Sequence, residues 1–217
     1  MTNNTIIYSH GFGVTKEDRG LFTDIADMLP GFHHVMFDYN TIDETHNTLT
    51  ATPLDKQAAM LHEEIASTRS QFPSRRISII AHSQGCVVAA MAAPHDIDNV
   101  IFLAPPTQFL GSKLAERPGT VIEPDGTIYY PRRDGSTTII REDYWKSRDG
   151  IDPIALYNTL ATTTHLTIIT ATHDEVLSAT DFSGLVDKIK IIELPADHDF
   201  TGGIRENLVS HIKDLLQ

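Results

Sequence analysis

The chain has 217 residues, of which 41% are hydrophobic and 21% are charged, and this is ordinary for one globular domain with a sizeable core. Its net charge of −12 disfavours a nucleic-acid partner, and its single cysteine excludes an internal disulfide framework. Because no apolar run reaches the length of a membrane span and no basic-then-apolar segment opens the chain, we expect a cytoplasmic protein without a membrane partner.

Strands and helices alternate along the chain, which is the pattern of a parallel sheet with helices on both faces. The first predicted strand covers residues 5–9 and leads into a His-Gly-Phe-Gly turn at residues 10–13. Because glycines on both sides of Phe12 let the backbone turn back toward the sheet, we predict that the Phe12 N–H can serve an oxyanion there. Two helices with an apolar stripe each are predicted near residues 21–29 and 54–72.

The most informative segment is Ala-His-Ser-Gln-Gly at residues 81–85. A β-branched run at residues 76–80 predicts a buried strand before it, and small apolar residues at 86–93 predict a helix after it. A serine on a sharp turn between strand and helix is typical of a nucleophile elbow, which requires small residues two positions before and after the serine. Ser83 is the predicted nucleophile, and the N–H of Gln84 at the helix start is a predicted oxyanion donor. The alternative is a plain helix entry.

A serine nucleophile needs a base, and the base needs an acid that orients it. Strands predicted at residues 165–171 and 188–194 are each followed by a loop that carries one of these groups. Asp174 lies on the first loop and His198 on the second, and loops after parallel strands leave the same edge of a sheet. We predict that both side chains converge on Ser83 as a catalytic triad.

Two other aspartates, Asp197 and Asp199, compete with Asp174 for the role of the acid. They flank His198 too closely in sequence to reach its Nδ1 atom easily, so we expect them to cap the loop or face solvent. The chain has 11 histidines, and His198 stands out through its place after the last strand. No histidine spacing matches a metal motif, and the predicted chemistry needs no metal or other cofactor.

The alternation breaks between about residues 107 and 157, where Pro, Gly and charged residues accumulate. A turn signal at residues 133–135 predicts a β-hairpin, and a short helix is predicted at 142–146. This segment is too long for an ordinary loop, so we predict a lid over the catalytic edge, with a surface excursion as the alternative. Aromatic residues gather in it, and those that we expect to bind substrate are Tyr129, Tyr130 and Trp145.

Together these pieces resemble an α/β-hydrolase, and more narrowly the small bacterial cinnamoyl and feruloyl esterases and the serine-aminopeptidase-like hydrolases. The matching segments occur in family order at residues 10–12, 36–39, 81–89, 101–105, 173–174 and 196–200. The resemblance implies a single domain over residues 1–217 with a minimal α/β-hydrolase fold, a doubly wound and mainly parallel sheet of about six strands with a small inserted lid. Carried over by position, the resemblance implies that Ser83 is the nucleophile, His198 the base and Asp174 the orienting acid. It implies that the N–H groups of Phe12 and Gln84 are the oxyanion donors.

One loop departs from the family pattern. Similar enzymes continue from the Phe-Asp-aromatic segment into a Gly-x-Gly-x-Ser turn, whereas residues 40–47 of this chain contain no glycine. This difference alters a loop beside the predicted site and so bears on the class of substrate.

The leading hypothesis is a serine hydrolase that cleaves carboxylic esters of short acyl or aromatic acids through an acyl-enzyme on Ser83. Its partner is a small-molecule ester. A thioesterase or peptidase with the same triad is one alternative, and a hydrolase-fold binding module with little turnover is another. Ester, thioester and amide substrates share the acyl-enzyme chemistry, so the sequence leaves the three open.

Overall fold

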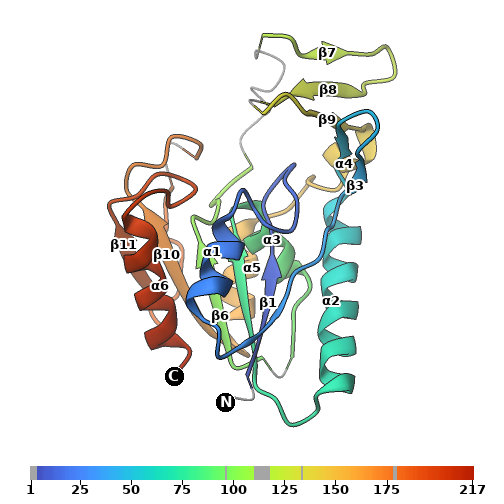
Figure 1. Ribbon diagram of the computed structural model, residues 1–217. Coiled ribbons are helices and arrows are strands. Elements are labelled where there is room, and N and C mark those ends of the chain that lie inside the picture. Colours follow the sequence, from blue (N-terminus) through green and yellow to red (C-terminus); the bar gives the residue numbers. More distant parts are fainter. Residues whose placement is uncertain (1–3, 96, 110–117, 133, 178–179) are drawn as a thin grey trace.

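The computed structural model describes residues 4–95, 97–109, 118–132, 134–177 and 180–217. Six parallel strands form a central sheet in the order β11-β10-β6-β5-β1-β2 (Figure 1). Their bounds are β1 (Thr5–Ser9), β2 (His33–Val35), β5 (Ile77–His82), β6 (Asn99–Leu103), β10 (His165–Ala171) and β11 (Lys190–Leu194). The prediction of a mainly parallel sheet of about six strands is confirmed.

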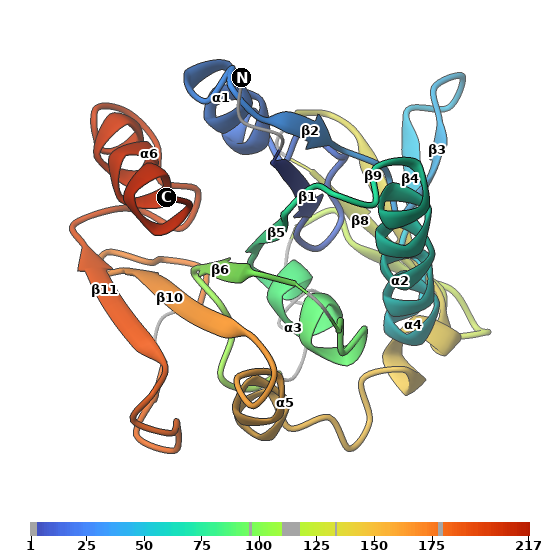
Figure 2. The same ribbon diagram turned by 90° about the horizontal axis from the view of Figure 1, so that it is seen from below.

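Helices cover both faces of this sheet, as Figure 2 shows. One face carries α2 (Leu54–Gln71), α3 (Gln84–Met91) and α5 (Pro153–Leu160). The other face carries α1 (Leu21–Met28) and α6 (Ile204–Leu215). None of the helices in the described ranges combines the length and the apolar character that a membrane crossing requires.

Alternate strand residues divide the apolar core into two clusters. In β1, Ile7 packs in the cluster with α2, α3 and α5, whereas Ile6 and Tyr8 pack in the cluster with α1 and α6. Successive side chains of a strand point to opposite faces, and a strand covered on both faces therefore consists almost wholly of apolar residues. This double burial explains the continuous β-branched runs that mark the central strands in the sequence.

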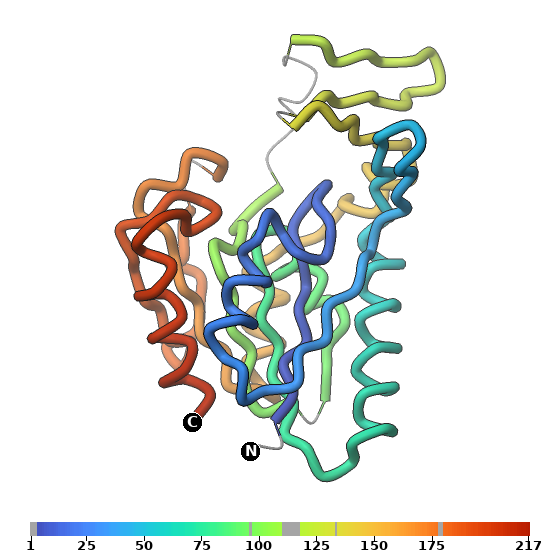
Figure 3. The backbone as a smooth tube through the Cα atoms, in the orientation of Figure 1, coloured from blue at the N-terminus to red at the C-terminus, as the bar shows by residue number. Residues whose placement is uncertain are grey.

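A second sheet lies at one end of the molecule, in the order β3-β4-β9-β8-β7 (Figure 1). Its strands are β3 (Thr41–Asp43), β4 (Thr48–Thr50), β7 (Val121–Ile122), β8 (Ile128–Pro131) and β9 (Thr137–Ile140). The predicted hairpin is confirmed as the antiparallel pair of β8 and β9, and the predicted short helix as α4 (Glu142–Lys146). We call residues 107–157 the lid, after the role that the sequence predicts for them and that stays a prediction. Residues 110–117 and 133 of this segment lie outside the described ranges. β1 begins and α6 ends at the opposite end of the molecule (Figure 3).

The glycine-free segment at residues 40–47 contributes to this second sheet, which the sequence did not indicate. β3 and β4 form an antiparallel hairpin, and β4 pairs in parallel with β9 of the lid. Asn47 lies in the turn of the hairpin with φ +50°, a left-handed conformation that asparagine tolerates better than most residues. The departure from the family pattern therefore ties the lid to a loop of the main domain.

The turn after β5 is strained and tightly packed. Ser83 has φ +51° and ψ −127°, a combination that is rare for residues other than glycine. Gly85 then faces the backbone of β1, where an added Cβ would lie 2.1 Å from the carbonyl oxygen of Ser9. The hydroxyl of Ser9 donates to the carbonyl oxygen of Gly85 at 2.8 Å, which holds α3 against β1. The predicted need for a small residue two positions after the serine thus arises from direct backbone contact.

This contact predicts a large effect of Gly85→Ala on stability. The new methyl group overlaps backbone atoms that cannot rotate away, so we expect the free energy of unfolding in urea to fall by about 3 kcal/mol or more. Gly203 is the matched control, because it has helical φ and ψ and open space around its Cα. Gly203→Ala should change stability by less than about 1 kcal/mol. Equal effects of the two substitutions would contradict the packing argument.

Candidate active site

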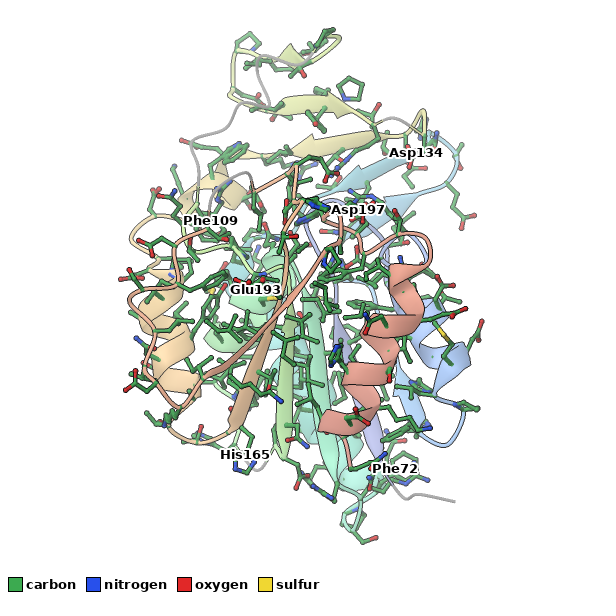
Figure 4. The ribbon with its side chains drawn as sticks, turned by 90° about the vertical axis from the view of Figure 1, so that its left-hand side faces the viewer. Phe72, Phe109, Asp134, His165, Glu193 and Asp197 are labelled. Carbon is green, nitrogen blue, oxygen red and sulfur yellow. The ribbon has the colours of Figure 1, made fainter. Side chains whose placement is uncertain are left out.

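Three loops meet at one edge of the central sheet because its parallel strands all end on the same side. Ser83 follows β5, Asp174 follows β10 and His198 lies in the loop after β11. Figure 4 shows Asp197, which also follows β11, at the end of the sheet toward the lid, and His165, which opens β10, at the opposite end. The structure brings the three side chains of the predicted triad together at this edge.

His198 links the other two side chains. Its Nε2 atom is 3.0 Å from Ser83 Oγ, and its Nδ1 atom is 2.7 Å from Asp174 Oδ2. An ionised carboxylate only accepts hydrogen bonds, so Nδ1 carries the proton of the neutral ring and Nε2 is left to accept from the serine hydroxyl. His198 is only 3% exposed, so the contacts of its ring are shielded from bulk water.

Asp174 is held by the backbone of its own loop. Its Oδ1 atom accepts hydrogen bonds from the N–H groups of Val176 and Leu177, both at 2.8 Å. Burial raises the pKa of Asp174, but the hydrogen bond and charge of His198 and the two N–H groups outweigh burial and lower the pKa. The carboxylate is therefore ionised at neutral pH and oriented toward the imidazole.

The two rival aspartates have other partners. Asp197 accepts hydrogen bonds from the N–H and the hydroxyl of Thr201 and so caps its loop. Asp199 forms an ion pair with Arg19 near the surface, at 2.7 Å. The expectation that these side chains cap the loop or face solvent agrees with these contacts.

The loop after β1 lies against the serine. A Cβ added to Gly11 would lie 3.4 Å from Ser83 Cβ, so Phe12 is one residue away from this contact. Gln84 is the first residue of α3, and N–H groups in the first turn of a helix have no partner within the helix. Both predicted oxyanion donors therefore flank Ser83, and their role stays a prediction.

His10 fixes the geometry of that loop. Its Nε2 atom accepts a hydrogen bond from the N–H of Tyr39 at 3.0 Å, so Nδ1 carries the proton and donates it to the carbonyl oxygen of Gly11 at 3.0 Å. His10 is only 1% exposed, and burial lowers its pKa by more than the Gly11 hydrogen bond and nearby carboxylates raise it. The ring is therefore a neutral imidazole with one defined tautomer.

A second histidine–aspartate pair supports the loop that carries His198. His82 Nδ1 is 2.8 Å from Asp18 Oδ2, and His82 Nε2 is 2.9 Å from the carbonyl oxygen of His198. Both partners accept, so both ring nitrogens of His82 donate and the ring is an imidazolium. Burial by itself lowers the pKa of His82, but the charge and hydrogen bond of Asp18 outweigh burial and raise the pKa. Both side chains are 1% exposed, so the two form a buried ion pair.

Three potential metal-ligand atoms, from His82, His198 and Asp199, lie within 4.8 Å of one another. Both ring nitrogens of each histidine already have hydrogen-bond partners, and Asp199 pairs with Arg19. A metal ion would have to displace these partners. The grouping is therefore part of the hydrogen-bonded site described above.

Two of the lid side chains predicted to bind substrate line different cavities, Tyr129 one beside Val121 and Trp145 one beside Phe109. Tyr129 is 38% exposed on β8, and Tyr130 is buried. Trp145 lines a cavity of about 510 Å³ together with Phe109 and Arg148. Their contact with substrate stays a prediction.

Tyr144, which the sequence did not single out as a site residue, contacts the elbow directly. Its hydroxyl donates to Gln84 Oε1, and its ring centre lies 5.2 Å from that of Phe12. The side chain is 1% exposed. The aromatic pair in the predicted lid helix was the available signal, but a helix this short does not show in sequence which ring faces the elbow.

Comparisons with known proteins identify the fold. No family model matches the sequence, and no curated protein matches it. Est1E from Butyrivibrio proteoclasticus superimposes with a TM-score of 0.69 at 18% identity, over 99% of this chain and 87% of that one. The esterase domain of a Rhodothermus marinus protein superimposes with a TM-score of 0.65 at 15% identity, over 100% of this chain and 89% of that one. The enol-lactonase from Burkholderia xenovorans LB400 superimposes with a TM-score of 0.64 at 15% identity, over 98% of this chain and 91% of that one. The chain has an α/β-hydrolase fold.

The neutral, buried state of His10 predicts a pH dependence of stability. Below about pH 6.5 the unfolded chain protonates this residue while the folded chain resists protonation, so stability falls as pH falls. The contribution of His10 reaches at most about 1.4 kcal/mol per pH unit. His10→Asn keeps a donor near the Nδ1 position but does not titrate. We expect urea unfolding between pH 5 and pH 8 to show a shallower acid loss for this variant, and equal slopes would contradict the neutral tautomer.

Proposed function

We propose that this chain, with its α/β-hydrolase fold, is a serine hydrolase that cleaves carboxylic esters through an acyl-enzyme on Ser83. One observation carries the proposal. Hydrogen bonds join Ser83 Oγ, the His198 ring and the Asp174 carboxylate in sequence, at 3.0 and 2.7 Å. A serine hydroxyl needs such a base, and the base needs such an acid, before it can attack a carbonyl carbon. The strained turn at Ser83 supports the proposal, because it presents the hydroxyl at the start of a helix.

In acylation, Ser83 Oγ attacks the carbonyl carbon of the ester while His198 Nε2 takes the hydroxyl proton. Asp174 keeps Nε2 facing the serine and stabilises the imidazolium that forms. The carbonyl oxygen gains negative charge, for which the N–H groups of Phe12 and Gln84 are the proposed donors. His198 then gives its proton to the leaving alcohol as the tetrahedral intermediate collapses.

In deacylation, water is the nucleophile and Ser83 Oγ is the leaving group. His198 Nε2 takes a proton from water as the water oxygen attacks the acyl carbon, and it returns a proton to Ser83 Oγ as the acid leaves. Each half-reaction begins with the neutral ring protonated at Nδ1. This is the tautomer that a hydrogen bond to an ionised Asp174 selects.

The proposed substrates are esters of short acyl or aromatic acids. A structure of Est1E, which superimposes on this chain with a TM-score of 0.67, holds ferulic acid, an aromatic acid. Aromatic side chains of the lid are the proposed contacts for such an acid, and they are Tyr129, Tyr130 and Trp145. Thioesters and amides would pass through the same acyl-enzyme, so they belong in the same substrate panel.

Removing the nucleophile tests the function directly. We expect the protein to hydrolyse p-nitrophenyl esters graded in acyl length and a methyl ester of an aromatic acid, more slowly for long fatty chains. Ser83→Ala should lower turnover by roughly 10⁶ and abolish labelling by a fluorophosphonate probe, with the circular dichroism spectrum unchanged. Retained labelling would remove Ser83 from the mechanism. Ester binding without turnover in the unaltered protein would identify a binding module instead.

The assignment of the acid is tested separately. Asp174→Asn should lower turnover by about 10⁴, because the amide favours the wrong imidazole tautomer. Asp197→Asn and Asp199→Asn are the matched controls and should cost less than about tenfold, because each carboxylate has a partner other than His198. If Asp197→Asn or Asp199→Asn proved more damaging than Asp174→Asn, the role of the acid would pass to that residue.

A further inference from the structure

An arginine of the lid reaches the loop after β1. Arg132 lies between β8 and β9, and its Nε donates to Thr138 Oγ1 at 2.8 Å. Its Nη2 donates to the carbonyl oxygen of Phe12 at 3.2 Å. The guanidinium carbon also lies 5.2 Å from the centre of the Phe12 ring and 5.1 Å from that of Tyr130, distances at which a cation and an aromatic ring attract.

The space that this guanidinium fills exists because residue 13 is a glycine. A Cβ on Gly13 would lie 1.6 Å from Arg132 Nη2 and 2.8 Å from its Cζ. Gly13 also has φ +62°, a conformation that costs glycine little. The second glycine of the His-Gly-Phe-Gly turn therefore both closes the turn and admits a side chain from the lid.

The peptide groups around Phe12 are held from both sides. The N–H of Gly11 donates to Asp18 Oδ2 at 3.1 Å, and the carbonyl oxygen of Gly11 accepts from His10. The carbonyl oxygen of Phe12 accepts from Arg132. Among the backbone groups of Gly11 and Phe12, only the Phe12 N–H has no hydrogen-bond partner within the described residues. An N–H that is held in place and left unpaired beside a nucleophile meets the requirement for an oxyanion donor.

A second contact joins the lid to the elbow. The hydroxyl of Tyr144 in α4 donates to the side chain of Gln84, and the Tyr144 ring packs on Phe12. Both residues proposed as oxyanion donors therefore touch the lid.

Backbone hydrogen bonds fix the lid relative to the main domain. The N–H of Ala51, just after β4, donates to the carbonyl oxygen of Ile139 at 2.9 Å, and β4 pairs with β9 along its length. The N–H of Leu54 at the start of α2 donates to Ser147 Oγ at 2.9 Å. Arg132 therefore extends from a sheet that is already anchored to the main domain.

We propose that Arg132 is a positioning residue that holds the Phe12 N–H in the orientation that binds the oxyanion. The lid then completes the oxyanion hole before substrate arrives, in addition to any contact with the acyl group. This inference rests on the proposed function, because it takes the Phe12 N–H as an oxyanion donor. Arg132 itself exchanges no proton and forms no bond with substrate.

Arg132→Met tests the inference, because methionine keeps an unbranched side chain and removes the donors and the charge. We expect kcat for a p-nitrophenyl ester to fall about 10- to 100-fold, as expected when an oxyanion donor is misplaced by about 1 Å, with KM within about twofold. Binding of a trifluoromethyl ketone, which forms a tetrahedral adduct with the serine, should weaken by the same factor as kcat/KM. Arg132→Lys should recover part of the loss in kcat, because lysine keeps the positive charge and an ammonium group that donates hydrogen bonds.

Arg141→Met is the matched control, since Arg141 is an exposed arginine of the same lid at the start of α4, and it should leave kcat unchanged. Thr138→Val is a second test of the inference, because it keeps Arg132 and removes the hydroxyl that accepts from its Nε. This variant should lower both kcat and the affinity for the ketone. Unchanged kcat in Arg132→Met, or a loss confined to KM, would overturn the inference. If Arg132→Met does not fold, an unchanged kcat in Thr138→Val would overturn it. Ester hydrolysis that survives Ser83→Ala would instead overturn the proposed function.

Discussion

The close approach of α3 to β1 is the constraint on which the rest of the site depends. Gly85 lets the helix backbone come so near to β1 that even a methyl group would overlap the carbonyl oxygen of Ser9. This approach forces the strained turn at Ser83 and sets the serine against Gly11 of the neighbouring loop. The proposed nucleophile and the Phe12 N–H thereby belong to one rigidly packed unit, whose geometry follows from the spacing of strand and helix.

Three buried histidines near Ser83 have ring nitrogens whose hydrogen-bonding roles their neighbours determine. His10 lies between a backbone N–H and a carbonyl oxygen, so it is neutral and protonated at Nδ1. His82 lies between a carboxylate and a carbonyl oxygen, two acceptors, so it is an imidazolium. His198 lies between a carboxylate and a hydroxyl, which leaves Nε2 free to take a proton. Histidine thus stiffens one loop as His10, supports a second as His82 and is proposed as the base in a third as His198. The three roles differ because each ring nitrogen donates or accepts according to the group opposite it.

The second sheet is built from two distant parts of the chain, and this gives a structural role to the loop that departs from the family pattern. Residues 41–50 supply β3 and β4, and backbone pairing of β4 with β9 attaches the inserted segment along a whole strand. A segment attached in this way is held against the main domain, since its detachment would break the hydrogen bonds between β4 and β9. The contacts of Arg132 and Tyr144 with the elbow region depend on that attachment.

The sequence by itself determined the parallel sheet, the elbow and the order of serine, aspartate and histidine along the chain. These features follow from local patterns, apolar runs and small residues at fixed spacing, and from the rule that parallel strands end on one side. Only the tertiary structure decided which distant groups face one another. Asp18 meets His82 across 64 positions and Arg132 meets Phe12 across 120, and no periodicity in the chain marks either pair. A local sequence pattern indicates the face of an element on which a side chain lies. The protonation state of a side chain and the orientation of an N–H group depend instead on the atoms that contact them in the folded chain.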